Sequence, residues 1–401
     1  MAMSMTGREW VFALTLAVAV VGCGGDNGGT SPDVVTVTVA PAVALAVGVG
    51  DTVQFTAEAW DEAGNRAAGA HVSWRSANTA VATVDDQGRA VAVAAGTTAV
   101  SATSGGGSGS ASLEVWVPAE VTAYEVGTSY FGRRSYVEYI PGELPVVVSA
   151  PHGGSLTPTE IPDRTWGTTV TDTNTEETLL AIRTALVEGT GKAPHVVISH
   201  LRRTKLDPNR EIEEAAQGNP FAENAWNEFQ AYIETASSAV TKTYGSGFYI
   251  DLHGHGHAIA RAELGYLLSS AQLNRTDAEI NAQGVAEQSS IRALAASSPF
   301  SFAELLRGPT SLGGLMQKEG IRSLPSPGDP SPGSEDYFTG GYNTARHGSR
   351  EVGRTVSGVQ IELPLPGIRD TAANRQAFAE ALAKVLEAYM TEHFGFFRIP
   401  S

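Results

Sequence analysis

Two different spacings of apolar residues divide this chain of 401 residues, and the change falls at Pro118. From Val34 to Val117, short runs alternate apolar with polar or small residues, as one-sided strands do. After Pro118, short apolar runs alternate with stretches in which apolar residues recur every three or four positions. Strands alternating with helices indicate a mixed, mostly parallel sheet flanked by helices. The pattern therefore predicts two folded domains, over residues 34–117 and 118–401.

The first domain is predicted to be an all-β sandwich, with turn signals at residues 62–65 and 85–88 between its strands. Val72-Ser73-Trp74, residues 80–84 and residues 96–102 resemble the hallmarks of bacterial Ig-like domains of the second group. The predicted strands carry no catalytic groups. The resemblance, which covers residues 34–117, implies a spacer or an adhesive role.

The amino terminus predicts export. Arg8 precedes an apolar run from Trp10 to Val21, which is too short to span a bilayer but has the length of a signal-peptide core. The run ends in Val20-Val21-Gly22-Cys23, which resembles the lipobox of bacterial lipoproteins. The resemblance implies a signal peptide over residues 1–22 and a lipid anchor at Cys23 that tethers the protein to the bacterial cell envelope. An ordinary signal peptide with an incidental cysteine is the alternative.

Composition narrows the range of partners. Residues 23–33 are rich in glycine and predict a flexible linker. Cys23 is the only cysteine, so no intramolecular disulfide is possible. The formal net charge of −16 argues against nucleic acid as a partner.

In the second domain, apolar runs at residues 144–149, 196–198, 248–250 and 359–363 predict buried strands. Helical spacing predicts helices over residues 179–187, 221–240 and 372–394. Residues 173–176 have the form of a capping box at the start of the first helix.

Polar groups lie at the ends of these strands, where open α/β sheets keep their sites. His152 follows the first strand. The third strand runs into a segment with Asp251, His253 and His255, whose side chains would all point to the same side if the backbone there is extended. His152, His253 and a carboxylate make a donor set suited to zinc with an open position for water. Glu362, at the end of an apolar strand, is the candidate general base.

Ordered motifs over residues 125–397 resemble the N-formylglutamate amidohydrolase family, which is similar in fold to zinc carboxypeptidases and aspartoacylases. The motifs are residues 149–154, 205–210, 251–255, 340–344 with 347–349, and 360–362. Ser155 stands where the glutamate of the carboxypeptidase His-x-x-Glu pair would fall.

The resemblance implies one zinc ion held by His152, His253 and an acid, for which Asp172 is the choice and Glu176 the alternative. It implies that Glu362 activates water. Arg202 or Arg203 is the candidate to stabilise the oxyanion. The expected substrate-binding residues are Asn209 and Arg210, which would bind a carboxylate, together with Tyr342, His347 and His255.

The sequence thus predicts a surface-anchored, zinc-dependent amidohydrolase that acts on an N-acyl amino acid or a peptide-like substrate with a free carboxylate. The alternative is an adhesion or ligand-binding lipoprotein with an inactive hydrolase-like domain. A hydrolase of cell wall or poly-γ-glutamate is a third possibility within the enzyme class.

Overall fold

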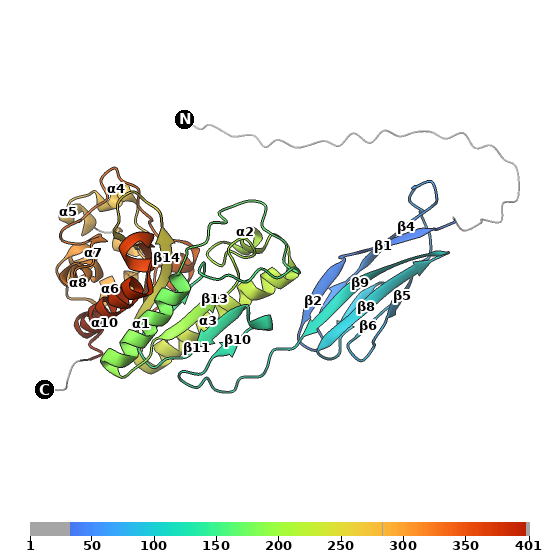
Figure 1. Ribbon diagram of the computed structural model, residues 1–401, viewed down its shortest axis with the longest axis horizontal. Helices are drawn as coiled ribbons and strands as arrows, with labels where there is room; N and C mark the ends of the chain where they lie inside the picture. Colours follow the sequence, from blue (N-terminus) through green and yellow to red (C-terminus); the bar gives the residue numbers. More distant parts are fainter. Residues whose placement is uncertain (1–32, 283, 398–401) are drawn as a thin grey trace, which may run out of the picture.

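The structure is a computed structural model that describes residues 33–282 and 284–397 (Figure 1). The predicted signal peptide, the lipidation site Cys23 and all of the predicted linker except Asp33 lie outside the described residues. Among the described helices, none is both long and apolar enough to cross a membrane.

The first part of the described chain is a β-sandwich. A four-stranded sheet in the order β2-β9-β8-β5 accompanies a three-stranded sheet, β3-β7-β6, and a two-stranded sheet, β1-β4. Phe55, Val100 and Leu113 are fully buried among the sheets. The strands are β1 (Thr36–Ala40), β2 (Val43–Val47), β3 (Thr52–Gln54), β4 (Thr56–Trp60), β5 (Ser73–Ser76), β6 (Ala82–Val84), β7 (Arg89–Ala92), β8 (Gly96–Ser104) and β9 (Gly107–Trp116). The predicted all-β fold is confirmed, although the sequence pattern missed β2.

The second part is built on a mixed sheet of eight strands in the order β10-β11-β13-β12-β14-β17-β15-β16. The central strands β13, β12, β14 and β17 are mutually parallel, whereas β11 and β15 pair antiparallel with β13 and β17. The strands are β10 (Tyr130–Phe131), β11 (Val137–Ile140), β12 (Val146–Ala150), β13 (His195–Ser199), β14 (Gly247–His255), β15 (Ala262–Gly265), β16 (Ser323–Leu324) and β17 (Val356–Pro364).

Helices cover both faces of this sheet, as the alternating pattern predicted. Helices α1 (Thr175–Thr190) and α10 (Ala372–Phe394) lie side by side and share one apolar core with the sheet, and α3 (Pro220–Tyr244) packs in a second core on the other face (Figure 1). The shorter helices are α2 (Ile212–Ala216), α4 (Ser270–Leu273), α5 (Asp277–Ile280), α6 (Arg292–Ser297), α7 (Phe302–Arg307), α8 (Leu312–Lys318) and α9 (Tyr342–His347).

Two local predictions need correction. The capping box at residues 173–176 is absent, because α1 starts at Thr175 after Asn174, whose left-handed backbone (φ 64°) turns its side chain away from the helix. The Asn174 amide instead donates to the carbonyl of Arg369 (2.7 Å). The strand predicted over residues 248–250 continues as β14 to His255, so His253 lies within a strand and not in a loop after it.

A buried arginine joins the two parts of the chain. The Arg133 side chain is 1% exposed, and its guanidinium binds both carboxylate oxygens of Glu114 in β9 at 2.7 and 2.6 Å. It also binds Glu160 at 2.6 Å and lies 4.3 Å from the ring centre of Phe221. Because Glu160 lies between His152 and Asp172 in the sequence, the sandwich is connected to the loop that carries two candidate metal ligands.

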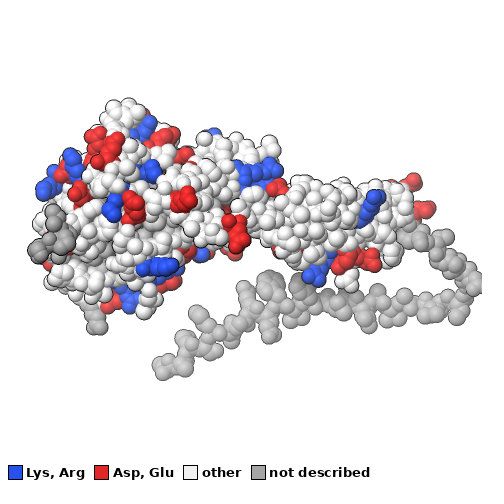
Figure 2. Space-filling model, turned by 90° about the horizontal axis from the view of Figure 1, so that it is seen from below, with Lys and Arg blue, Asp and Glu red and all other residues white. Residues whose placement is uncertain are grey.

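Surface charge agrees with the composition. Figure 2 shows acidic and basic side chains interspersed over the visible face, with no broad basic surface of the kind that binds nucleic acid.

Candidate metal centre

The connections of the central strands change direction at the carboxyl ends of β12 and β14. The chain passes from β12 through α1 to β13 on one side, then through α3 to β14 on the other side of β12. Ligand sites in open α/β sheets lie at such a change of direction. His152 follows β12 and His253 lies in β14, so the topology brings the two imidazoles together at this point.

The three predicted metal ligands His152, Asp172 and His253 form a buried triangle. The Nδ1 atoms of the two histidines are 3.1 Å apart, and they lie 3.3 and 3.2 Å from the same oxygen, Asp172 Oδ2. Ligands held about 2.0–2.1 Å from a tetrahedral ion are about 3.3 Å apart. The spacing of these three atoms therefore fits a shared metal ion.

The opposite nitrogen of each imidazole is held by a carboxylate. His152 Nε2 lies 2.6 Å from Asp207 Oδ1, and His253 Nε2 lies 2.8 Å from Asp251 Oδ2. Because a carboxylate only accepts hydrogen bonds, these contacts place a ring proton on each Nε2, so Nδ1 is the nitrogen of each imidazole that can bind a metal ion. Three potential ligand atoms face one another, as in a metal site in which outer carboxylates orient the histidines.

The electrostatics also favour a cation at the triangle. Burial alone would raise the pKa of Asp172, but His152 and His253 outweigh it and hold that pKa well below its usual range. Burial lowers the pKa of His253, but Asp251 and Asp172 outweigh it and raise that pKa to about 10. In the absence of a metal, a proton supplies the positive charge that the surrounding carboxylates demand.

Close backbone packing holds the His152 loop in place. The Asp172 amide donates to the carbonyl of His152 (3.1 Å), and the Gly254 amide donates to Asp172 Oδ2 (3.1 Å). A Cβ atom on Gly153 would lie 2.6 Å from the Glu176 nitrogen, and one on Gly154 would overlap the backbone at His200. The two glycines after His152 thus permit a close approach that no other residue allows.

Glu362 lies beside the triangle with one free carboxylate oxygen. It is the register partner of His253 across β14 and β17, so both side chains project from the same face of the sheet. Gln360 donates to Oε1 (2.8 Å), whereas the buried Oε2 has no hydrogen-bond partner among the described residues. Burial raises the pKa of Glu362 to about 7, with His253 opposing and Asp172 adding to the rise. A carboxylate with such a pKa is suited to move protons near neutral pH.

Glu176, the alternative acid, lies outside the triangle. Its carboxylate contacts His200 Nδ1 (3.1 Å), and His200 Nε2 contacts Glu138 (3.1 Å). Of the two candidates, the structure places Asp172 with the histidines.

The His200 contacts predict a dependence of stability on pH. Burial lowers the pKa of His200, but Glu138 and Glu176 outweigh it and raise that pKa to about 9. Because the pKa is above its unfolded value, we expect the added stability to be complete below about pH 6.5 and lost as pH rises through 9. Urea unfolding at pH values on both sides of this window should show a decrease in the free energy of unfolding of the unaltered protein, and His200→Asn should lack this decrease. An equal loss in both proteins would contradict the prediction.

The two candidate oxyanion residues lie in different environments. Arg203 is buried, and its guanidinium donates to Asp207 Oδ2 (2.9 Å) and Asp172 Oδ1 (3.4 Å). Arg202 is exposed, and the described contacts do not join its side chain to the triangle. The structure thus brings Arg203, and not Arg202, to the site, where it neutralises carboxylates that orient the ligands.

The predicted substrate-binding residues are spread more widely. Asn209 Nδ2 lies 3.3 Å from His253 Nε2, and the half-buried Arg210 donates to the Asn209 carbonyl (2.8 Å). Tyr342 accepts a hydrogen bond from Arg346 and lies near Trp226. Two histidines have other partners: His347 contacts Gln230 (2.6 Å) and Glu234 (3.2 Å), and His255 contacts the Arg261 carbonyl (2.8 Å).

Sequence reasoning missed several residues that support the site. Asp207 lies in the motif at residues 205–210, and the sequence predicts no role for it, although it holds His152. Asn343 connects Asn209 to Asp251, and Ser149 donates to Asp251 (2.6 Å). Arg369 lies against Gly254, where a Cβ atom would overlap its guanidinium. The position of Ser149 at the end of an apolar strand was a usable signal.

Replacing Asp207 tests the support of His152. We expect Asp207→Asn to weaken metal binding by about 10- to 100-fold, because an amide orients the imidazole without strengthening its donor nitrogen. Competition with a chromogenic chelator measures the affinity. Asp163→Asn, which changes an exposed carboxylate paired with Lys205, is the matched control and should leave the affinity unchanged.

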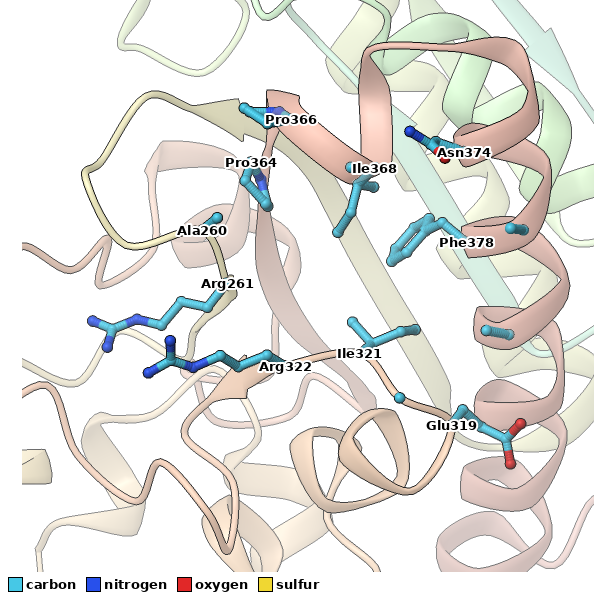
Figure 3. Close-up of a pocket in the computed structure, with 14 residues that line it drawn as sticks. Ala260, Arg261, Glu319, Ile321, Arg322, Pro364, Pro366, Ile368, Asn374 and Phe378 are labelled. Carbon is cyan, nitrogen blue, oxygen red and sulfur yellow. The ribbon is translucent and has the colours of Figure 1, made fainter.

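A mostly apolar groove of about 350 Å³ is lined in part by Pro364, the register partner of His255 (Figure 3). Ile321, Ile368 and Phe378 form its walls, and Arg261 and Arg322 extend away from them. None of the residues in the metal triangle lines this groove.

Comparisons with known proteins concern both parts of the chain. The family model of the bacterial Ig-like domain (group 2) matches residues 33–115. The N-formylglutamate amidohydrolase from Ralstonia eutropha JMP134 aligns with 65% of this chain and 99% of its own, at 11% identity and a TM-score of 0.40. A gene product of Agrobacterium tumefaciens aligns with 64% of this chain and 95% of its own, at 15% identity and a TM-score of 0.35.

Domains 4 and 5 of the S-layer protein SbsC align with 21% of this chain and 53% of their own, at 23% identity and a TM-score of 0.20. A comparison with curated proteins gives no significant match. The strand pattern, the buried core and the family model agree on the first part of the molecule. Residues 33–115 are a bacterial Ig-like domain of group 2.

Proposed function

We propose that this protein is a zinc-dependent amidohydrolase of the bacterial cell envelope, and that it cleaves an amide bond in an N-acyl amino acid or a peptide-like substrate with a free carboxylate. One observation carries the proposal. The Nδ1 atoms of His152 and His253 converge with Asp172 Oδ2, next to a carboxylate, Glu362, that has a free buried oxygen. This is the donor set of a catalytic zinc site with a general base beside it.

His152, Asp172 and His253 would hold the metal. A zinc ion there would polarise an amide carbonyl and make a water molecule easier to deprotonate. Glu362 Oε2 is available to take a proton from water, because Gln360 holds only Oε1. The oxygen of this water bonds to the amide carbon, and Glu362 passes the proton to the amine nitrogen as the carbon–nitrogen bond breaks, which gives a carboxylic acid and an amine.

The residues beside the triangle support recognition of a carboxylate. Asn209 is buried next to His253, and Arg210 is half-buried beside it, with its Nε 3.3 Å from Glu214. A planar guanidinium at the edge of the site is suited to bidentate capture of a substrate carboxylate. This proposal gives the pair the role of fixing the substrate while Glu362 acts on water.

A location at the cell surface is part of the same proposal. The motif that ends at Cys23 has the form of a lipobox, and a spacer or adhesive role of the Ig-like domain would suit a protein held at a surface. Labelling of whole cells with a membrane-impermeant reagent, with and without Cys23→Ser, tests the anchor. Release of the Cys23→Ser protein into the medium is the expected result.

The decisive experiment combines metal analysis with hydrolysis. The purified protein is assayed for zinc by elemental analysis and for amine release from N-formyl- and N-acetyl-amino acids and from poly-γ-glutamate. We expect bound zinc and hydrolysis that a chelator abolishes and added zinc restores. Zinc binding without hydrolysis of any member of the panel would favour the binding lipoprotein, and absence of both would overturn the proposal.

A further inference from the structure

A second group of potential metal ligands lies one step further along the same strand. His255 ends β14, His257 follows in the next loop, and Glu263 lies in β15. One donor atom from each of the three lies within 4.8 Å of the others. Because side chains alternate along a strand, His255 projects from the same face of the sheet as His253.

We propose that His255, His257 and Glu263 form a second binding site for a divalent transition metal. Two imidazoles and one carboxylate are a donor set that suits zinc. The inference goes beyond the proposed function, because it concerns metal content and does not depend on amide hydrolysis.

The hydrogen bonds around the second group orient its donor atoms. His255 Nε2 donates to the carbonyl of Arg261 (2.8 Å), so the lone pair is on Nδ1, where it accepts a hydrogen bond from the His257 amide (3.1 Å). His257 Nδ1 lies 3.0 Å from Glu263 Oε1, a separation close to that of two ligands on one ion. The Phe338 amide donates to the other oxygen, Glu263 Oε2 (2.9 Å). A bound ion would replace the hydrogen bond from the His257 amide to His255 Nδ1 and the hydrogen bond between His257 Nδ1 and Glu263 Oε1.

Packing fixes the His257 ring as well. It lies parallel to the Phe338 ring, with an interplanar angle of 2° and centres 4.6 Å apart. The same residue thus holds both His257, through its ring, and Glu263, through its amide. A histidine held in this way loses little side-chain entropy when it binds an ion.

Charge gives a second reason for a cation. Glu263 is fully buried, and it is the register partner of Glu362 across β15 and β17. Carboxylates at directly opposed positions repel each other. Arg261 offsets only part of this charge, because its Nε lies 3.9 Å from Glu263 Oε1 and its Nη2 donates to the Asp336 carbonyl.

The position of Glu362 connects the two groups. It pairs in register with His253 on one side and with Glu263 on the other. The carboxylate with the free oxygen therefore lies between the two metal-binding groups on one face of the sheet. An ion at the second group would act on the charge of Glu362 from the side opposite the first.

Metal stoichiometry tests the inference. After equilibrium dialysis of the full chain against zinc, elemental analysis is expected to give two ions per chain. We expect His257→Ala and Glu263→Gln each to give one ion, since the first removes a donor at a partly exposed position and the second keeps the shape of the buried side chain. His71→Ala, which removes an exposed histidine of the Ig-like domain, should leave two.

One ion per chain in the unaltered protein, or two in both variants, would overturn the inference. His253→Ala identifies the remaining ion, because it removes the first site and should leave the second. Two ions without hydrolysis would support the second site while the proposed function failed. Hydrolysis with one ion per chain would support the proposed function and overturn the second site.

Discussion

Glu362→Gln is expected to lower kcat for amide hydrolysis by about 10³-fold, or about 4 kcal/mol in the activation free energy. The amide cannot accept a proton from water, and Glu362 is not among the three atoms of the triangle. Zinc at His152, Asp172 and His253 should therefore remain bound. Steady-state kinetics on the best substrate of the panel, together with elemental analysis, measures both effects.

Glu176→Gln is the matched control, because it makes the same chemical change in a carboxylate that contacts His200. It should keep both zinc and hydrolysis. Full activity of Glu362→Gln would exclude Glu362 as the general base. Loss of zinc in Glu176→Gln would mean that Glu176 and not Asp172 is the third ligand.

Arg133→Met is expected to destabilise the protein by about 3 kcal/mol or more, because it leaves the carboxylates of Glu114 and Glu160 without their buried partner. Methionine preserves much of the apolar contact with Phe221, so the loss reports the charge and its hydrogen bonds. Urea unfolding followed by tryptophan fluorescence measures the change. Because the chain has two domains, the transition of each is followed separately.

Arg134→Ala provides the comparison for Arg133. Arg134 binds the same two carboxylates at 3.3 and 2.7 Å, but its side chain is 54% exposed. A solvated ion pair contributes little, and we expect a loss of at most about 1 kcal/mol. Equal losses in the two variants would show that burial of Arg133 does not strengthen the contact between the domains.

Those features of the site that depend only on residues close together in the sequence could be predicted from it. Alternation along an extended segment placed Asp251, His253 and His255 on one side, and β14 has that conformation. The position of His152 after an apolar run placed it at a strand end. These predictions use only the geometry of a strand and the rule that sites lie at carboxyl ends.

The remaining features depend on which strands become neighbours. That Glu362 lies beside both His253 and Glu263 follows from the order β14-β17-β15, and the sequence contains no local signal for that order. The contact between Asp207 and His152 likewise depends on the path of a loop after β13. No role for His257 could be predicted, because its partner Glu263 lies in β15, a strand for which the sequence pattern gives no signal.

The buried Arg133 also constrains how this architecture can evolve. A domain that served only to extend its neighbour into solvent could be duplicated, exchanged or lost by recombination without effect on the neighbour. Here β9 supplies Glu114 to a guanidinium that also holds the loop between His152 and Asp172. A substitute domain would need a carboxylate at the equivalent position, so we expect the two domains to be inherited as a unit.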